Sequence, residues 1–354
     1  NIVEDFFISV SNANGFWPDL QPLGPPVNTE YREGSKCLSP DEQILYFTAC
    51  DRPDGKGSCD LYYSRKIGSK WGPPQNMGFP VNSSKWESQP SISSDGRTLY
   101  FASGRSGGKG NKDIWKTTLK EDGTWENPVS IEINTEGSDE SPFIHPDNQT
   151  IYFCSDGHPG MGGSDLFFSK KNAEEKFSVP VNLGYPINTL SNEFSVFVSA
   201  GGETAYFASD REEGFGGLDI YSFELHKDAR PVKVTYVKGF VYDFNSKKKL
   251  NARFELIDLE TKQPVIQSFS NPDNGSFLVC LPVDKNYALN VSREGYLFYS
   301  ADNKKIVQAR LDGYSFNKLK PYSNWEDFSG EAMKYWNLFV ELFKPTLITR
   351  LAVR

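Results

Sequence analysis

Residues 204–221 read TAYFASDREEGFGGLDIY, and this stretch decides the fold because three related copies precede it. The copies begin at Ile44, Thr98 and Thr150, and the Tyr-Phe pairs of the four stretches are spaced 54, 52 and 54 residues apart. A fixed period of this length is typical of repeat architectures. Each copy contains an apolar strand, a glycine-rich loop and a second strand that opens on an aspartate. The chain is therefore predicted to be built from one repeated unit.

Each unit extends its copy on both sides. An alternating stretch such as residues 195–198 and a turn such as 94–96 precede the Tyr-Phe strand. A further strand follows it, with Trp71, Trp125 or Phe177, and leads to Pro and Asn. Four short strands with turn residues between them are typical of a propeller blade. The sequence thus predicts an all-β fold with at least four full blades.

The N-terminal residues fit the same register. Residues 5–9 match the third strand of a unit, and Phe16-Trp17 match the fourth. The chain is therefore expected to begin halfway through a blade, with two inner strands upstream or supplied elsewhere. Counting this half gives five or six blades in all, whereas a bare four-bladed ring leaves residues 1–24 without a role.

Two further regions follow the repeats. The propeller is assigned to residues 1–230, and the polar segment 225–233, with Pro231, is interpreted as a linker. Residues 234–312 alternate about seven short strands with turns, which indicates a small β-sandwich. Residues 316–354 form a tail with a predicted helix between Asn324 and Pro345. This helix either docks on a partner or a membrane surface, or it packs on its own domain or belongs to an atypical terminus.

Composition excludes several classes of protein. Of the 354 residues, 14% are aromatic, and Gly and Pro are plentiful, which favours strands and turns over a helical bundle. The net charge of −8 argues against binding nucleic acid through phosphates. No apolar run approaches 18 residues, so no transmembrane helix is expected. Because no signal peptide is visible and Asn1 comes first, the chain is expected to be processed or to start further upstream.

The five cysteines give one candidate disulfide. Cys50 ends the second strand of the first full unit and Cys59 opens the third, so the two flank one hairpin loop. Antiparallel neighbours at such positions can form a disulfide in an oxidising compartment. The alternative is that Cys50 and Cys59 are two buried free thiols of a protein in the reducing cytosol. Cys37, Cys154 and Cys280 are interpreted as small core residues.

Two sets of carboxylates recur once per unit. The first is predicted to accept backbone N–H bonds and lock the glycine loops, with the loop arginines 52, 105 and 211 as partners: Asp60, Asp113, Asp165 and Asp219. The second precedes the inner strands and is a candidate ring at the channel mouth, attracting a cation or a basic peptide: Glu33, Glu87, Glu140 and Glu193. Capping of the preceding turns is the alternative for the second set. Because a single active site needs residues that differ between blades, residues repeated in every blade are more consistent with a structural role than with catalysis.

Other catalytic or ligand-binding signals are weak. Residues 104–108 match G-x-S-x-G, but a nucleophile elbow needs a following helix, and a strand is expected here. The three histidines, His145, His158 and His226, form no zinc-binding spacing. We therefore predict no catalytic residue, no cofactor and no metal.

The repeats resemble TolB-like propeller repeats of envelope proteins from Bacteroidota. The clearest copy runs from Val181-Asn182-Leu183-Gly184, through Ile187-Asn188-Thr189, to Gly216-Gly217-Leu218-Asp219-Ile220-Tyr221. Residues 234–310 look like a carboxypeptidase regulatory-like module, on the basis of 239–243, 274–277 and 295–296. This order resembles OmpA-family proteins, including PorE-like components of type IX secretion. The peptidoglycan-binding domain of that family is not recognisable after residue 310.

The resemblance implies a periplasmic protein associated with the outer membrane. We expect a non-enzymatic scaffold that binds envelope proteins in anchoring or type IX secretion, with peptidoglycan bound only through a domain outside this chain. The alternative is a propeller that recognises a peptide or glycan at its channel mouth. An enzyme on a propeller is the least favoured hypothesis, because no asymmetric His, Cys or Ser constellation stands out.

Overall fold

A computed structural model describes residues 4–10, 12, 14, 16–172, 174–243, 246–272, 274–283, 285–293, 305–310, 313–318 and 333–334. It divides into two compact units, Asn1–Gly239 with Leu278–Asp284, and Phe240–Phe277 with Lys285–Arg354. Among the described residues no helix is long and apolar enough to cross a membrane. Strands dominate both units, and the all-β fold predicted from the sequence, a propeller followed by a small β-sandwich, is confirmed.

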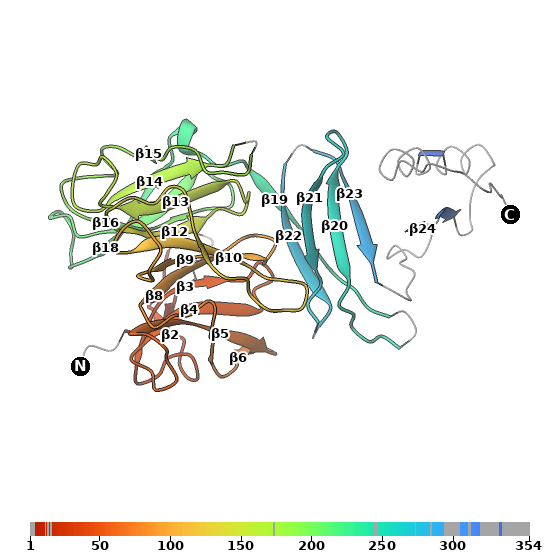
Figure 1. The fold of residues 1–354 in the computed structure, drawn as a ribbon, viewed down its shortest axis with the longest axis horizontal. Coiled ribbons are helices and arrows are strands. Elements are labelled where there is room, and N and C mark those ends of the chain that lie inside the picture. The colour runs from red at the N-terminus through yellow and green to blue at the C-terminus, as the bar shows by residue number, and fades with distance from the viewer. Residues whose placement is uncertain are drawn as a thin grey trace. The chain divides into compact units, whose positions relative to one another are not determined.

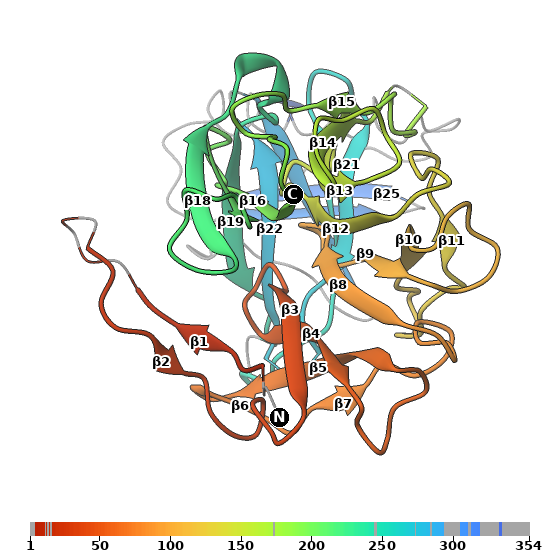
Figure 2. The same cartoon turned by 90° about the vertical axis from the view of Figure 1, so that its left-hand side faces the viewer.

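The first unit is built from successive antiparallel sheets that follow one another around an arc (Figure 2). The first full blade contains β3 (Arg32–Leu38), β4 (Ile44–Cys50), β5 (Cys59–Ile67), β6 (Lys70–Trp71) and β7 (Gln75–Asn76). The second contains β8 (Glu87–Ile92), β9 (Thr98–Ser103), β10 (Asp113–Thr118) and β11 (Val129–Ser130). The third contains β12 (Asp139–Ile144), β13 (Thr150–Ser155), β14 (Asp165–Lys170) and β15 (Val181–Asn182).

The recurring Tyr-Phe pair explains how the blades pack. Neighbouring residues of a strand point to opposite faces of the sheet. In the second blade Phe101 packs in a core with residues of the first blade, whereas Tyr100 packs in a core with residues of the third. The third blade repeats the arrangement with Phe153 and Tyr152. The core of the arc is thus a series of apolar layers, one between each two consecutive blades.

The predicted N-terminal half blade is present as β1 (Phe7–Ile8) and β2 (Gln21–Pro22), which pair antiparallel. Phe6 is buried against Phe47 of the first full blade. The fourth-strand position lies at Gln21–Pro22 rather than at Phe16-Trp17, where the sequence placed it. In the full blades the predicted aromatics are paired, since Trp71 lies in β6, which pairs with β5, and Trp125 and Phe177 form bridges with Leu119 and Lys171. A second short strand, β7, β11 or β15, then pairs with the third strand further along the chain.

The fourth blade differs from the four-stranded expectation. Its sheet has three strands in the described part of the chain: β16 (Glu193–Val198), β17 (Thr204–Ser209) and β18 (Asp219–Glu224). After β18 the chain turns away, because Leu225 and Ala229 are buried in the core between the third and fourth blades. The short helix η1 (Lys227–Ala229) lies in this segment, and Val232 then donates its N–H to the carboxylate of Asp147. The segment interpreted as a linker is therefore docked on the propeller.

Beyond the propeller, β19 (Val234–Phe240) pairs with β22 (Ser276–Pro282). A three-stranded sheet has β20 (Arg253–Asp258) between β21 (Pro264–Phe269) and β23 (Tyr287–Ser292), and β24 (Lys305–Arg310) pairs with β25 (Gly313–Lys318) (Figure 1). Val241, Leu250 and Ala252 form a small apolar core in the second unit. Apart from residues 333–334, which are helical, the predicted tail helix lies outside the described residues.

Candidate functional site

The four glycine-rich loops between the second and third strands are closed by the recurrent aspartates. Each carboxylate, at the start of its third strand, accepts N–H bonds from two consecutive loop residues. The pairs are Asp60 with Lys56 and Gly57, Asp113 with Lys109 and Gly110, Asp165 with Met161 and Gly162, and Asp219 with Phe215 and Gly216. The loops are thus held by the aspartates in the way that the repeat predicts.

Two kinds of close contact require glycine in these loops, one with the loop aspartate and one with the backbone of the next blade. A Cβ at Gly108 would lie 2.0 Å from Asp113 Oδ2, and one at Gly160 would lie 1.7 Å from Asp165 Oδ2. A second glycine meets the next blade, because a Cβ at Gly110 would lie 1.7 Å from the carbonyl oxygen of Gly137. In the first three blades the loop therefore lies against the segment that enters the following blade, as Gly57, Gly110 and Gly162 show. We call the surface formed by these loops and entry segments the loop face: residues 51–58, 77–86, 104–112, 131–138, 156–164, 183–192 and 210–218.

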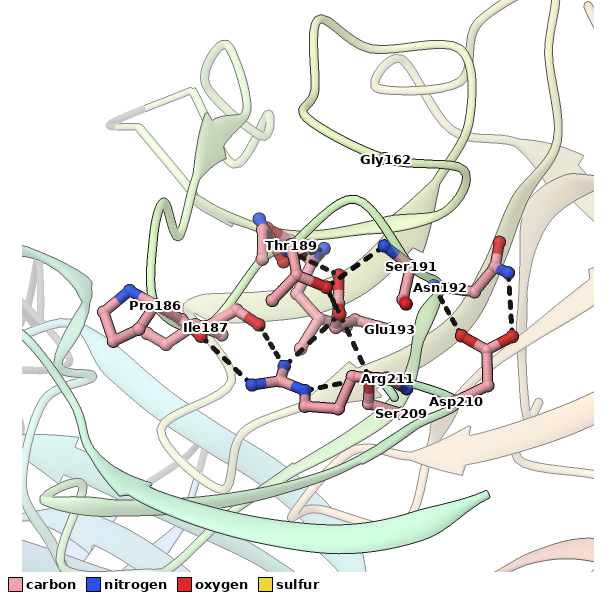
Figure 3. Close-up of polar contacts among 12 residues, drawn as sticks. Gly162, Pro186, Ile187, Thr189, Ser191, Asn192, Glu193, Ser209, Asp210 and Arg211 are labelled. Atoms are coloured by element: carbon pink, nitrogen blue, oxygen red, sulfur yellow. Dashed lines mark hydrogen bonds and ion pairs between the residues drawn. The ribbon is translucent and has the colours of Figure 1, made fainter. Parts of the chain in front are cut away.

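Buried carboxylates at the start of the inner strands fix the entry segments. Glu193 has no exposed surface and accepts bonds from the amide and hydroxyl of Thr189 at 3.1 and 2.7 Å (Figure 3). It also accepts a bond from Ser209 and pairs with Arg211 at 3.3 Å. Arg211 in turn donates to the carbonyls of Pro186 and Ile187. Its bonds within one blade are those expected of a turn cap, the alternative that the sequence left open.

A buried carboxylate caps the entry segment in the other three blades too, and in one of them it is an aspartate instead of a glutamate. Glu33 and Glu87 cap Thr29 and Ser83, and both are buried. In the third blade the cap on Thr135 is Asp139 rather than Glu140, which the sequence had placed in the series. Asp139 stands five residues after its asparagine, as do the other three caps, whereas Glu140 stands six after it. Glu140 instead forms a partly exposed ion pair with Lys112 at 2.9 Å.

The loop arginines pair with this second set of carboxylates and not with the loop aspartates. Arg105 lies 3.3 Å from Glu87, donates to the carbonyls of Pro80 and Val81, and stacks over Phe101 and Trp115. The cross-strand register causes this, since Ser103, two residues before Arg105, faces Glu87 on the neighbouring strand. In the third blade His158 takes the arginine position and binds the carbonyl of Ile133 at 2.8 Å.

Hydrogen bonds between inner strands also join the blades, and the sequence pattern did not reveal them. Each inner strand has a bulge with a residue of positive φ, such as Gln89 and Ser141. Gln89 donates its N–H to Thr48 of the first blade and accepts the N–H of Ser141 from the third. Polar side chains near the centre of the arc are therefore used in joining blades.

The remaining candidates lie apart from one another. Ser106 is exposed in a turn that leads into strand β10, not into a helix. His145 is buried beside Asp147, and His226 is exposed at the start of η1. Within the described residues, no group of three or more His, Cys, Asp or Glu side chains is arranged to hold a metal.

Cys50 and Cys59 form a disulfide between β4 and β5, where they are directly paired across the hairpin. Cys37, Cys154 and Cys280 are free thiols. Burial raises the pKa of the Cys37 and Cys154 thiols to about 12, which suits core residues and not nucleophiles.

Several large apolar side chains of the loop face point into solvent. Phe215 is fully exposed, and Phe79, Tyr185 and Leu190 are each more than three-quarters exposed. All four side chains belong to loop-face segments, and exposed apolar surface of this kind marks interaction sites where it is contiguous. The loop face therefore combines an internally hydrogen-bonded frame with large apolar side chains that are exposed to solvent.

No protein-family model and no curated protein matches the chain. Among solved structures, it is similar to a TolB protein from Agrobacterium tumefaciens at 14% identity, covering 75% of this chain and 95% of that one, with a TM-score of 0.34. It is also similar to the periplasmic gluconolactonase PpgL of Pseudomonas aeruginosa, at 15% identity over 87% and 85% with a TM-score of 0.36. The NanB sialidase of Streptococcus pneumoniae matches at 13% identity over 64% and 36%, with a TM-score of 0.40.

Proposed function

We propose that this chain is a non-enzymatic interaction propeller of the periplasm that binds other envelope proteins through its loop face. The observation that carries the proposal is the contrast within that face. Its recurrent carboxylates and arginines are bonded inside their own blades, whereas Phe79, Tyr185 and Phe215 face solvent. A rigid frame with exposed aromatic anchors favours a binding surface, since aromatic residues dominate the energetics of protein interfaces.

The Cys50–Cys59 disulfide supports a periplasmic location. Disulfides persist in oxidising compartments and are rare in the cytosol. Association with the outer membrane and a part in envelope anchoring or type IX secretion are the finer form of the proposal. They rest on the resemblance of the repeats to those of OmpA-family envelope proteins, whose peptidoglycan-binding domain would supply the link to the cell wall.

The test compares two sets of exposed substitutions. In the first variant Phe79, Tyr185 and Phe215 are replaced by Ser on the loop face. In the control Val129, Val179 and Val181, which are also exposed but lie at or beside the outer strands, are replaced by Ser. Each protein carries a photoreactive cross-linker and is incubated with envelope extract, and the cross-linked proteins are identified and quantified.

We expect the unmodified chain and the control to cross-link the same few envelope proteins, and the loop-face variant to lose them. Equal cross-linking by both variants would contradict a binding role for the loop face. The alternative function, recognition of a peptide or glycan at the channel mouth, would be favoured if array-bound glycans or peptides were retained and no protein were cross-linked. The chain alone is expected not to sediment with purified peptidoglycan.

A further inference from the structure

The fourth blade exposes the face that the other blades bury. Leu61, Ile114 and Leu166 each follow the loop aspartate of their blade and have no exposed surface, whereas the corresponding Ile220 is 81% exposed. The same holds for the tyrosine of the Tyr-Phe pair, which is at most 6% exposed in the first three blades and 37% exposed at Tyr206. In the first three blades the next blade along the chain buries these positions. In the fourth blade the same positions are exposed, so this blade presents a surface of the kind that elsewhere forms an interface between blades.

The outer edge of the fourth blade is also open. In the first three blades the third strand pairs with a short fourth strand. An asparagine after that strand then caps the backbone, as Asn188 does by accepting the N–H of Leu166 and donating to its carbonyl. In the described part of the chain β18 has neither partner. Gly216, unlike Gly57, Gly110 and Gly162, has no neighbouring backbone from a following blade.

At the N-terminal end of the arc, the two inner strands of a blade are missing from the described residues. β1 and β2 occupy third- and fourth-strand positions, and Asn28 caps Phe6 as Asn188 caps Leu166. Phe6 packs on the first full blade. Within the described residues β1 has no second strand on its inner side, although every full blade pairs its second and third strands. β1 and β18 are the two ends of the arc and lie on the same side of the view in Figure 2. We call the exposed face of β18, with Ile220 and Tyr206, and the inner side of β1 together the gap.

We propose that this gap is the docking site of one further repeat unit of the same polypeptide, which closes the ring between β18 and β1. The pattern that fits is that of residues 171–218, about 50 residues, because it runs from the end of one third strand to the aspartate of the next. The added unit would supply a fourth strand that pairs with β18 and an asparagine that caps the backbone of Ile220. Its two inner strands would cover Tyr206, and the second of them would pair with β1. Its last loop would stand before Asp5 as residues 210–218 stand before Asp219.

The test adds a copy of residues 171–214 before Asn1 of the full chain, so that residues 1–4 take the places of residues 215–218 and the copied loop reaches Asp5 in register. Hydrogen–deuterium exchange is then measured at β18 and at β1, together with the melting temperature and the molar mass in solution. We expect slower exchange of both strands, a monomer, and a melting temperature higher by about 5 °C or more. Unchanged exchange at β18 and β1 in a folded fusion would overturn the proposal.

Two matched substitutions show whether the added unit occupies the predicted face. Ile220→Asp is expected to leave the melting temperature of the original chain unchanged, because the side chain is exposed, and to lower it in the fusion. Val265→Asp, at an exposed strand position of the second unit, is expected to have the same small effect in both. If Ile220→Asp has equal effects in both proteins, the added unit does not cover this face and the proposal fails.

If the fusion does not fold, the same unit is co-expressed as a separate polypeptide. Co-purification with the original chain that is abolished by Ile220→Asp and retained by Val265→Asp would support the proposal, and absence of co-purification would count against it. If the original chain instead forms dimers that protect β18 and that Ile220→Asp dissociates, a second copy is the occupant and the proposal of a further repeat unit is wrong.

Discussion

The guanidinium of Arg105 lies 3.3 Å from the carboxylate of Glu87, whose side chain has no exposed surface. The carboxylate also accepts bonds from the amide and hydroxyl of Ser83 and the hydroxyl of Ser103. This cluster joins the entry segment of the second blade to the end of its second strand. Burial lowers the pKa of Arg105, and the charge of Glu87 and its hydrogen bond oppose that effect.

Glu87→Ala is expected to lower the free energy of unfolding by about 3 kcal/mol, because it leaves a buried guanidinium and two donors of Ser83 without their acceptor. Urea unfolding followed by tryptophan fluorescence measures the change. Glu140→Ala is the control, since its ion pair with Lys112 is partly exposed and is expected to contribute less than about 1 kcal/mol. Equal losses in the two variants would show that the Glu87 cluster has no special structural role.

Much of this arrangement could be predicted from the sequence, because the repeat places equivalent residues at equivalent positions. The loop-closing role of the aspartates and the order of the strands within each blade follow from local sequence patterns. The prediction of Glu140 as the cap of the third blade is wrong because Asp139 and Glu140 are adjacent and both acidic. Only the spacing of five residues from Asn134, as in the other three units, separates the two. Weighting spacing above residue type would have identified Asp139.

Contacts set by tertiary register could not be predicted in the same way. Arg105 is close in sequence to Asp113, and this proximity alone favours a pairing of the two. The antiparallel pairing of β8 with β9 instead brings Arg105 to Glu87, 18 residues earlier in the chain. The bond between Gln89 and Ser141 depends on the bulges of two separate blades, so no local pattern indicates it.

Gly108→Ala tests the close approach that explains the glycine loops. A methyl group would lie 2.0 Å from a carboxylate oxygen of Asp113, so the loop and its two N–H bonds must be displaced. We expect a loss of about 2 kcal/mol or more in the free energy of unfolding. Gly217→Ala is the control, because nothing lies within 4 Å of its added methyl group and its φ is not in the left-handed region. Comparable losses at both positions would contradict this explanation.

Thiol chemistry tests the cysteine assignment. The native chain is expected to react slowly with a thiol reagent at pH 8, because burial raises the pKa of Cys37 and Cys154 to about 12 and also raises the pKa of Cys280. Unfolding without reductant is expected to release three reactive thiols, and unfolding with reductant five. Mass spectrometry of the labelled protein measures both counts. Five thiols without reductant would mean that Cys50 and Cys59 are not bonded in the isolated protein.

Replacing both bonded cysteines by Ser is expected to cost about 2–3 kcal/mol, because the disulfide closes only a short hairpin loop. The exposed pair Ser106 and Ser246, each changed to Ala, serves as a control for substitution at the surface. Chemical unfolding with and without reductant separates the effect of the bond from that of the side chains. A chain whose stability is unchanged by reductant would not depend on this disulfide.

Asp147 connects the third blade to the segment that follows β18, and its carboxylate predicts a dependence of stability on pH. Burial alone would raise its pKa, but contact with His145 and bonds from the amides of Thr150 and Gln149 outweigh burial, so the pKa lies below its ordinary value. A carboxyl group with a lowered folded-state pKa contributes stability above its unfolded-state pKa and loses it as the pH falls through the folded-state value. We therefore expect this contribution to be lost progressively as the pH falls below about 4 and through the lower folded-state pKa.

Asp147→Asn is expected to remove that pH-dependent contribution and about 1–3 kcal/mol of stability at pH 7, because the side-chain amide would face the N–H of Val232 with a second donor. Unfolding measured between pH 3 and 7, with hydrogen exchange at Leu225 and Val232, gives both quantities. Asp122→Asn is the matched control. Its pKa is also lowered, by bonds from Thr124, but the side chain is exposed and the exchange of Val232 should not change. If Val232 exchanges equally in all three proteins, Asp147 does not hold this segment against the third blade.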